Sequence, residues 1–548
     1  MSKINMFSLG GLNENGKNMY VVEVDEDIFV FEAGLQYADE HVLGIDYAIP
    51  NINYLKDNKE RIKGIFLTHG HDENIGAVCD IVDILDNVKI YASKFTYNIV
   101  LEELNESKKS SDNIVLIKEN RSIDFGKNKI IPVTLTHSIP DNFGYALCTE
   151  DGIIFYASDF VFDATMSGPY KTDLGRLAYI GRQGVLCLMT ESLYAGVRGH
   201  TSPNHRIQGL INTTLSKCKG RIIFNVLNSH LYRIQELFNE VSKTDRKIVV
   251  MGKRLQNIIN YSIQNNYLHI DSKYIGDLSN INDENVIILN SNEREKPYLN
   301  MIKIIDGYDK FIKINKNDTV FLATPVYEGS ESTFYKLLDR IAMTGANTVT
   351  LPPKKYLSYH ASSEDLMMMI ELMNPKYYFP VKGEYSEQVA NGDLALNLGI
   401  PSENIILKEN GSVATFENGK LIDSYKEIPT GVVYIDGESS DDIGELVLKD
   451  REVLSKDGIL IASATIDKKI KKILAGPEIL TRGFIYVKDS QELIDSIKGK
   501  CLAIINENTH NNYVDYSKIK NGIRDTLSKY LFEETGNRPM IITVIQEI

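Results

Sequence analysis

The sequence is poor in cysteine and contains no long apolar run. Its five cysteines lie far apart, form no C-x-x-C pair and are odd in number. That usage predicts reduced thiols and argues against a disulfide framework or a cysteine zinc ribbon. No apolar stretch approaches the roughly 20 residues of a transmembrane helix, and the N-terminus lacks a basic segment followed by an apolar one. We therefore expect a soluble, cytoplasmic protein that binds no membrane.

Positive charge is also scarce. Lysine and arginine number 60 against 74 aspartates and glutamates, which gives a formal net charge of −14. A field of that sign argues against a protein that coats nucleic acid or an anionic membrane. It does not exclude RNA as a partner, provided that a local basic groove meets the phosphates.

The 548 residues, 43% of them hydrophobic, are enough for two to four domains. Residues 19–31 predict two strands around an acidic turn. From residue 196 to 349 strands and helices alternate, which predicts an inserted parallel α/β domain. Residues 350–426 resemble residues 1–195 in pattern and are expected to complete the same domain. A linker is expected in 427–445. Residues 446–548 predict a compact α/β unit with strands near 458–466, 484–487 and 540–545.

A histidine-rich loop, Thr68-His69-Gly70-His71-Asp72-Glu73-Asn74, follows an apolar strand predicted for residues 62–67. Two further predicted strands end directly before His137 and Asp159. Three imidazole nitrogens and one carboxylate can bind zinc and leave one coordination position for water. A His-x-His turn alone has an alternative, two histidines that are exposed or hydrogen-bonded, but the order of the other ligands favours a metal site.

The loop resembles the His-x-His-x-Asp-His loop of metallo-β-lactamase hydrolases, in which two histidines hold one zinc and the Asp-His pair holds a second. Over essentially the whole chain, further segments resemble the ribonuclease J family, from the β-CASP branch of those hydrolases. The matching words are Thr68-His69-Gly70-His71, His137-Ser138-Ile139-Pro140-Asp141, Arg233-Ile234-Gln235, Pro380-Val381-Lys382-Gly383-Glu384-Tyr385, Thr481-Arg482-Gly483-Phe484-Ile485-Tyr486-Val487 and Arg538-Pro539-Met540-Ile541.

This resemblance implies an α/β protein with a metallo-β-lactamase αββα sandwich in residues 1–195 and 350–426. It also implies a β-CASP parallel α/β domain in 196–349 and a C-terminal α/β domain in 446–548 that helps the protein to dimerise. The activity of the family is 5′-to-3′ exoribonuclease and also endoribonuclease cleavage with two zinc ions, in mRNA decay and rRNA processing.

Carried over by position, the resemblance assigns the first metal to His69, His71, His137 and Asp159. The second metal falls to Glu73, Asn74, the bridging Asp159 and Lys382, where the family has Asp, His, the same Asp, and His. Asparagine is a poor zinc ligand, and a protonated lysine has no lone pair. The second metal site is therefore degenerate, and we expect at most one zinc ion per chain, with none as the other outcome.

Lys382 has two interpretations. Its ammonium group can reach Asp159 and Glu73 and neutralise carboxylates that lack their cation, because unpaired buried charge is costly. Alternatively, the side chain extends to solvent. Either arrangement removes the second cation of two-metal phosphodiester hydrolysis. We therefore expect weak or absent turnover.

The resemblance also assigns roles outside the metal ligands. The catalytic positions are Glu73 and His360. Glu32 stands where the family has a buried aspartate, and Glu191 occupies the first β-CASP acidic position. Each keeps the charge of the family residue but is one methylene longer. Tyr359 replaces a glycine of the family word Ser-Gly-His, so its ring either crowds the phosphate pocket or stacks on a base. The residues assigned to RNA binding are Ser229, His230, Tyr356, Leu357, Ser358, Tyr359 and His360.

Two hypotheses from different classes remain. The first is a degenerate ribonuclease J paralogue that acts as partner subunit of an active paralogue, in a homodimer or heterotetramer that handles RNA. The second is a slow metal-dependent exoribonuclease or endoribonuclease. A small-ester hydrolase of glyoxalase type would need neither the insertion nor the tail. The basic run Lys468-Lys469-Ile470-Lys471-Lys472 could contact phosphates, with a charged hairpin turn as its alternative.

Overall fold

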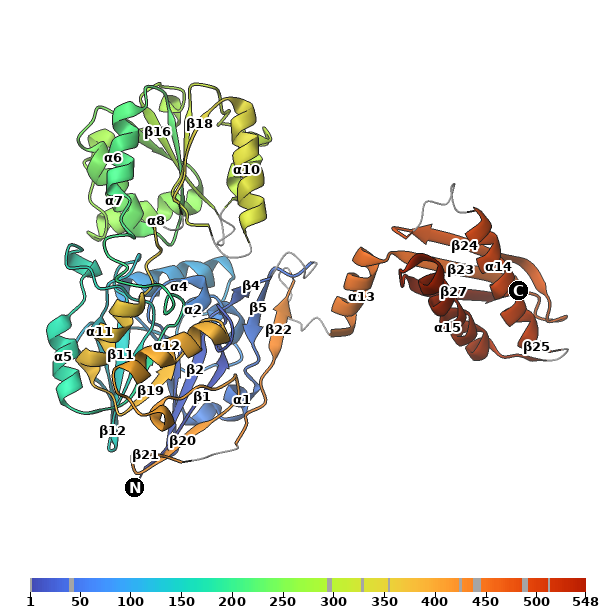
Figure 1. Ribbon diagram of the computed structural model, residues 1–548, viewed down its shortest axis with the longest axis horizontal. Coiled ribbons are helices and arrows are strands. Elements are labelled where there is room, and N and C mark those ends of the chain that lie inside the picture. Colours follow the sequence, from blue (N-terminus) through green and yellow to red (C-terminus); the bar gives the residue numbers. More distant parts are fainter. Residues whose placement is uncertain are drawn as a thin grey trace. The chain divides into compact units, whose positions relative to one another are not determined.

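The computed structural model describes residues 2–38, 44–292, 298–326, 330–352, 355–422, 426–436, 445–484, 491–510 and 513–548. The chain divides into two compact units. The first comprises Met1–Tyr37 and Ala48–Val432, and the second comprises Ala38–Tyr47 and Val433–Ile548. Figure 1 shows both units coloured along the sequence.

The first unit is built around two β-sheets. The larger sheet has the strand order β21-β20-β1-β2-β3-β6-β7-β8. Its antiparallel hairpin β2–β3 turns at Asp25 and Glu26, which confirms the prediction for residues 19–31. The strands are β1 (Lys3–Gly10), β2 (Met19–Val24), β3 (Asp27–Phe31), β6 (Ile62–Phe66), β7 (Ile90–Ala92), β8 (Ile114–Leu116), β20 (Ala414–Glu417) and β21 (Lys420–Ile422).

The second sheet has the order β19-β13-β12-β11-β10-β9. Strands β10, β11 and β12 are antiparallel neighbours, whereas β12, β13 and β19 run parallel. The parallel part therefore presents the carboxyl ends of three strands at one edge. The strands are β9 (Ile123–Phe125), β10 (Asn128–Thr134), β11 (Phe143–Thr149), β12 (Gly152–Ala157), β13 (Val185–Thr190) and β19 (Tyr377–Pro380).

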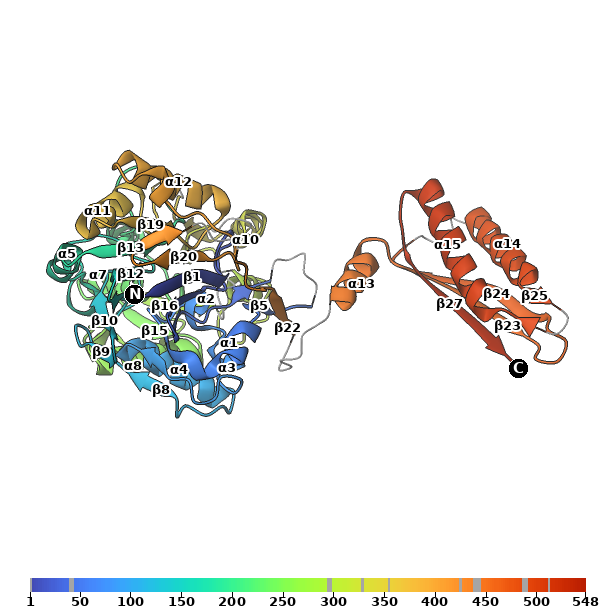
Figure 2. The ribbon, with the colours of Figure 1, turned by 90° about the horizontal axis from the view of Figure 1, so that it is seen from below.

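The two sheets pack face to face through aromatic side chains. Phe31 and Phe66 of the first sheet contact Tyr145 of the second, with ring centroids 6.0 and 5.7 Å apart. Figure 2 shows α5, α11 and α12 on one side of the sheets and α1, α3 and α4 on the other, so the αββα sandwich is confirmed. The helices are α1 (Asn53–Asp57), α2 (Asp72–Ile75), α3 (Val78–Ile81), α4 (Lys94–Glu106), α5 (Leu174–Arg182), α11 (Ser363–Met373) and α12 (Tyr385–Asn397).

An all-parallel sheet is inserted between β13 and β19, as the alternation in 196–349 predicted. Its order is β15-β16-β14-β17-β18, and both faces are covered by helices, as parallel sheets require. In Figure 1 it stands above the sandwich. The elements are α6 (Gln208–Lys217), β14 (Ile222–Leu227), α7 (Leu231–Val241), β15 (Lys247–Val250), α8 (Lys253–Gln264), β16 (Val286–Asn292), α9 (Leu299–Ile305), β17 (Thr319–Leu322), α10 (Glu331–Thr344) and β18 (Asn347–Val349).

The second unit contains a three-stranded sheet of order β24-β23-β27, packed on one face against two helices. Alternate residues of β23 are buried, as expected for a sheet covered on one side. The basic run 468–472 joins β23 to β24, and Lys471 pairs with Glu547, so it forms the charged hairpin turn. The elements are α13 (Glu445–Lys456), β23 (Ile459–Ile466), β24 (Ile473–Arg482), α14 (Gln491–Glu507), β25 (Thr509–His510), β26 (Tyr513–Val514), α15 (Tyr516–Thr535) and β27 (Met540–Glu547).

Three local predictions need correction. The strand expected near 484–487 is wrong at Phe484, because β24 ends at Arg482 and Gly483 has a left-handed φ of +66°. Residues 485–487 lie outside the described part of the chain. The linker predicted for 427–445 contains strand β22 (Val432–Ile435). Apolar residues recur at helical spacing in 76–85, which predicts one helix, but only the short helix α3 forms there and turns follow it.

No helix within the described residues combines the length and apolar character needed to cross a bilayer.

Gly34 allows the loop after β3 to pass against the backbone of the histidine loop. A Cβ at this position would lie 1.7 Å from the carbonyl oxygen of Glu73. We expect Gly34→Ala to lower the free energy of unfolding by at least about 1–3 kcal/mol, measured by urea unfolding. The control Gly209→Ala adds a Cβ in α6 where nothing lies within 4 Å, and it should be neutral or stabilising. Equal stability of the two variants would contradict this account.

Candidate active site

The candidate site lies where strands of both sheets end. His69 follows β6, His137 follows β10 and Asp159 follows β12. Glu191 directly follows β13, and Lys382 follows β19 after one intervening residue. Since β12, β13 and β19 are parallel neighbours, their carboxyl ends bring the last three side chains together, which is the usual position of sites on parallel sheets.

Three histidine rings form the metal-binding side of the site, with centroids 4.5 to 4.8 Å apart. His71 Nε2 donates to the carbonyl of Ser229 at 3.2 Å, and His137 Nδ1 donates to the carbonyl of Tyr359 at 2.9 Å. A carbonyl oxygen only accepts, so these nitrogens carry the protons of the neutral rings. His71 Nδ1 and His137 Nε2, 3.3 Å apart, therefore face each other as lone pairs.

This arrangement fits one metal ion. His69 Nε2 is buried without a hydrogen-bond partner among the described residues and lies 3.5 Å from Asp159 Oδ2. Burial lowers the pKa of His69 to about 4 and that of His137 well below its usual value, so neither ring is protonated at neutral pH. Ligand atoms of His69, His71, His137 and Asp159 all lie within 4.8 Å of one another. Convergent lone pairs beside a carboxylate are the donor set of a zinc-type site, and the two carbonyl acceptors orient the rings.

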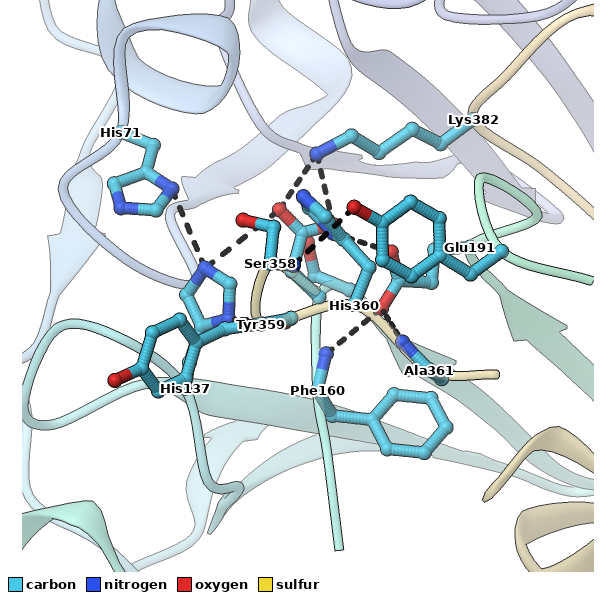
Figure 3. Close-up of polar contacts among 12 residues, drawn as sticks. His71, His137, Phe160, Glu191, Ser358, Tyr359, His360, Ala361 and Lys382 are labelled. Carbon is cyan, nitrogen blue, oxygen red and sulfur yellow. Dashed lines mark hydrogen bonds and ion pairs between the residues drawn. The ribbon is translucent and has the colours of Figure 1, made fainter. Parts of the chain in front are cut away.

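Lys382 occupies the other side of Asp159. Its ammonium group donates to both carboxylate oxygens of Asp159, at 2.8 and 2.6 Å, and lies 3.4 Å from Glu73 Oε1. Figure 3 shows the side chain extended into the centre of the site. The residue is 2% exposed, so the interpretation in which it reaches solvent is wrong and the contact with the two carboxylates is confirmed.

The charges of Lys382, Asp159 and Glu73 stabilise one another and leave one negative charge in excess. Burial disfavours the charge of Lys382, but Asp159 and Glu73 outweigh that effect and raise its pKa. Burial likewise disfavours both carboxylates, yet Lys382 holds the pKa of each well below its usual value. All three groups are therefore charged at neutral pH.

Asn74 does not face a metal position. Its side-chain oxygen accepts from Asn18 Nδ2 at 2.8 Å, and its Nδ2 donates to Glu32 Oε1 at 3.2 Å and Ser158 Oγ at 3.1 Å. Both ends of the amide are thus engaged away from Asp159. The ammonium group of Lys382 and this amide thus occupy two positions where the family has histidine ligands, while Asp159, Glu191 and His360 form a second group whose ligand atoms lie within 4.8 Å of one another.

Glu32 is fully buried behind the histidine loop. Its carboxyl group accepts from the amide and the hydroxyl of Thr68 and lies 3.2 Å from the hydroxyl of Tyr156. Burial raises its pKa to about 8, although the Thr68 hydrogen bonds favour the charged form. The group is therefore mostly protonated at pH 7.

Glu191 and His360 form a second pair in the site (Figure 3). Glu191 Oε2 lies 2.7 Å from His360 Nδ1, and Oε1 accepts from the amides of Phe160 and Ala361. Burial lowers the pKa of His360, but Glu191 more than compensates and the net shift is upward. His360 Nδ1 also lies 3.9 Å from Asp159 Oδ1. Glu73, the other predicted catalytic residue, is joined to Asp159 through the ammonium group of Lys382.

Tyr359 fills space between the sandwich and the inserted domain. Its ring is 0% exposed, lies 4.8 Å from the ring of His205, and is covered by the guanidinium group of Arg233 at 5.7 Å. No face of the ring is open to a base. The stacking interpretation of Tyr359 is therefore wrong. Its ring packs in an apolar cluster with Val161, Met166, Tyr170 and Tyr232, and crowding of the phosphate pocket stays a prediction.

The other residues assigned to RNA binding differ in exposure. His230 and Ser358 are each 4% exposed, whereas Ser229, Tyr356 and Leu357 are half-buried. A cavity of about 40 Å³ joins His71 and Ser229 to Arg254, which sequence reasoning missed. Arg254 reaches this position because α8 packs on α4 through an ion pair with Glu103 at 2.9 Å. Its only sequence signal is its place in a basic pair just after β15.

Comparisons with known proteins agree with this geometry. Family models match the metallo-β-lactamase superfamily in residues 12–156, the ribonuclease J β-CASP domain in 219–341, a Zn-dependent metallo-hydrolase RNA specificity domain in 354–403, and the ribonuclease J C-terminal domain in 446–548. A crystal structure of a protein of unknown function from Enterococcus faecalis covers 76% of this chain and all of its own, with a TM-score of 0.54 at 15% identity, and shows likeness of fold alone.

Fold and site thus define a metallo-β-lactamase protein of the β-CASP type. Ribonuclease J 2 of Staphylococcus epidermidis is 36% identical over 549 residues, covering 100% of this chain and 98% of the relative. Ribonuclease J 2 of Staphylococcus aureus is 37% identical with the same coverage. The chain belongs to the ribonuclease J family.

Glu32 gives the site a pH signature. Its pKa is about 8 in the folded protein against 4.5 ordinarily, so its contribution to stability is fully present below pH 4.5 and is lost as the pH rises through 8. Glu32→Gln removes this titration. Between pH 5 and pH 8, the free energy of unfolding of the variant should rise relative to that of the wild type by up to about 4 kcal/mol, measured by urea unfolding. The control Glu417→Gln, at an exposed position of β20, should show no such trend, and a parallel response of both variants would refute the assignment.

Proposed function

We propose that this chain is a ribonuclease J-type protein of RNA processing with weak or absent nuclease activity, which acts mainly as partner subunit of an active paralogue. The observation that carries the proposal is the ammonium group of Lys382 against Asp159, where the family has a histidine and a second metal. RNA processing, mRNA decay and rRNA maturation in the cytoplasm are the roles that family membership supports.

The donor set supports at most one zinc ion per chain, held by His69, His71, His137 and Asp159. When bound, zinc supplies Lewis acidity and an activated water. The carbonyl groups of Ser229 and Tyr359 keep two of the imidazoles in the tautomer that presents a lone pair. The chain's own contribution is therefore a preformed set of ligands.

The second cation of the reaction is replaced by a fixed charge. Hydrolysis with two metals needs an activated water and a second cation on the phosphate oxygens. The donors of Lys382 are directed at Asp159 and Glu73, so they are not free to polarise a phosphate. Losing one oxyanion donor costs about 10²- to 10³-fold in rate, and losing a dication costs at least as much.

The two predicted catalytic residues keep partial capacity. Glu73 is held charged by Lys382, and its lowered pKa makes it a poor base for a water molecule. His360 is oriented by Glu191, and its raised pKa suits it to donate a proton to a phosphate oxygen or leaving group. The site therefore retains the capacity to donate a proton through His360 better than the capacity to activate a water nucleophile through Glu73.

RNA contacts divide by exposure. The half-buried Ser229, Tyr356, Leu357 and His360 are placed to touch the strand. His230, Ser358 and Tyr359 are buried and shape the pocket from behind. A ring in the family's glycine position narrows the approach of the scissile phosphate.

The partner role follows from what the chain retains. The sandwich, the inserted sheet and the C-terminal unit each keep a packed core, so each part keeps its fold although the site departs from the family pattern. We propose domain limits of 1–195 with 350–426 for the sandwich, 196–349 for the β-CASP domain, 427–445 for the linker and 446–548 for a dimerisation domain. Assembly is a homodimer or a heterotetramer with the paralogue.

A second candidate function is a slow metal-dependent exoribonuclease or endoribonuclease. It is favoured by the four intact ligands of the first metal and by the pair of Glu191 with His360. Hydrolysis of 5′-monophosphorylated RNA by purified protein that is abolished in His71→Ala would establish it.

Restoring the family's ligands should restore chemistry. The triple variant Glu73→Asp/Asn74→His/Lys382→His replaces the fixed ammonium group by metal ligands, so we expect two zinc ions per chain by elemental analysis and at least about a 10²-fold gain in RNA cleavage. The wild type should contain one zinc or none. Lys382→Met, the control, removes the charge without adding a ligand and should gain no activity. Two zinc ions and processive cleavage in the wild type would contradict the proposal.

The partner role has a separate test. When the chain is mixed with an intact ribonuclease J paralogue of the same organism, light scattering after size exclusion should detect a hetero-oligomer at micromolar concentration. Deleting residues 446–548 should remove or weaken that species. Two homo-oligomers that never exchange would reject the partner role while leaving the site analysis intact.

A further inference from the structure

A large polar cavity lies at the amino ends of the inserted sheet. Its volume is about 760 Å³, and its lining residues precede or begin strands β14, β16, β17 and β18. Asn228 and Ser229 follow the carboxyl end of β14 and reach the histidine cluster. The two places are thus separated by the length of β14, about 20 Å for six residues.

The cavity concentrates lysine in a chain that is strongly acidic. Lys217, Lys219, Lys313 and Lys316 line it, and all four are exposed. Among the residues that the structure describes, none of the four is ion-paired with a carboxylate. Five cationic side chains in the lining face only two carboxylates, those of Glu284 and Asp318. The local field is therefore opposite in sign to the net charge of −14.

A buried ion pair fixes the walls of the cavity. Arg221 binds Asp318 through two hydrogen bonds of 2.9 and 2.7 Å, and it also donates to the carbonyl groups of Ile281 and Lys313 at 3.0 and 2.8 Å. These bonds join three loops that are distant in sequence. Because Asp318 neutralises Arg221, the lysines keep their charge for a ligand.

We propose that this cavity binds the phosphate backbone of RNA, an inference that rests on the proposed function. Lysine ammonium groups are mobile point charges that suit phosphates without demanding a planar partner. Asn282, Asn315, Asn317 and Asn347 add amides that can hydrogen-bond ribose hydroxyls and phosphate oxygens. The lining contains no aromatic ring, so the site offers no base stacking and reads no sequence.

Separation from the histidine cluster makes the contribution dependent on RNA length. An oligonucleotide of three residues bound at the cluster is too short to reach the lysines, whereas one of thirty residues can engage both places. We therefore expect the cavity to strengthen binding of long RNA only.

The test uses the full chain and 5′-monophosphorylated RNAs of both lengths, with affinity measured by fluorescence anisotropy at several salt concentrations. Lys217→Glu/Lys316→Glu should weaken binding of the long RNA at least tenfold and lower its salt slope by about 1.4, or about 0.7 for each phosphate that a lysine no longer neutralises. The control Lys129→Glu/Lys336→Glu makes the same change in net charge at exposed lysines outside the cavity, and it should leave both values near those of the wild type. Thermal melting verifies that both variants fold.

Each other outcome is decisive. Equal losses in the two double variants would assign the effect to bulk charge and overturn the inference. If Lys217→Glu/Lys316→Glu leaves the affinity for long RNA unchanged and the short RNA still binds, the cavity is not an RNA-binding site. The proposed function would be unaffected by that result. Competition by poly-glutamate that exceeds competition by RNA would identify an acidic protein as the ligand instead. Wild-type protein that binds neither RNA would refute the proposed function itself.

Discussion

The ion pair between Lys382 and Asp159 is the interaction on which the site depends. Asp159 and Glu191 are fully buried with ligand atoms within 4.8 Å of each other, and the half-buried Glu73 contacts the same ammonium group as Asp159. Carboxylates taken from water without a cation cost several kcal/mol each. In the family pattern exchangeable metal ions supply that charge. Here a covalently attached ammonium group supplies part of it, at a backbone position with φ of +53° that is held by hydrogen bonds to Gly11 and Ser192.

Neighbouring departures from the family pattern complement one another in size. Asn74 is shorter than the histidine it replaces, and Glu32 is one methylene longer than the family's aspartate. In the structure the amide of Asn74 donates to the carboxyl group of Glu32, so the extra methylene of Glu32 compensates for the shorter side chain of Asn74. The same amide accepts from Asn18, which satisfies its other end. These contacts form a hydrogen-bonded core behind the histidine loop, and the amide of Asn74 also lies 3.3 Å from His69 Nδ1, on the side of the ring opposite Nε2.

The sequence was sufficient where local pattern decides the outcome. Strand ends at His137 and Asp159 follow from apolar runs, and the reach of Lys382 follows from the charge of its neighbours. It was insufficient where distant segments meet. The burial of Tyr359 depends on His205 and Arg233 from the inserted domain, and the position of Arg254 depends on packing between α8 and α4. The lysines at residues 217, 219, 313 and 316 form one group only because Arg221 joins their loops. Gly483 carried a signal that was overlooked, since its left-handed backbone ends β24 before Phe484.

A fixed charge and an exchangeable one differ in what they permit. A dication on the phosphate stabilises charge that develops during cleavage, whereas the ammonium group of Lys382 is already neutralised by Asp159 and Glu73 before any substrate arrives. The carboxylates of the site are consequently compensated in part before substrate binds. Under the proposed function, the metal ligands, the pair of Glu191 with His360 and the pocket walls define where an RNA strand lies, and the surfaces outside the site do not depend on a second metal. Within one polypeptide, the chemistry of cleavage is therefore separable from the handling of RNA, because the first needs a mobile cation and the second needs only shape and distributed positive charge.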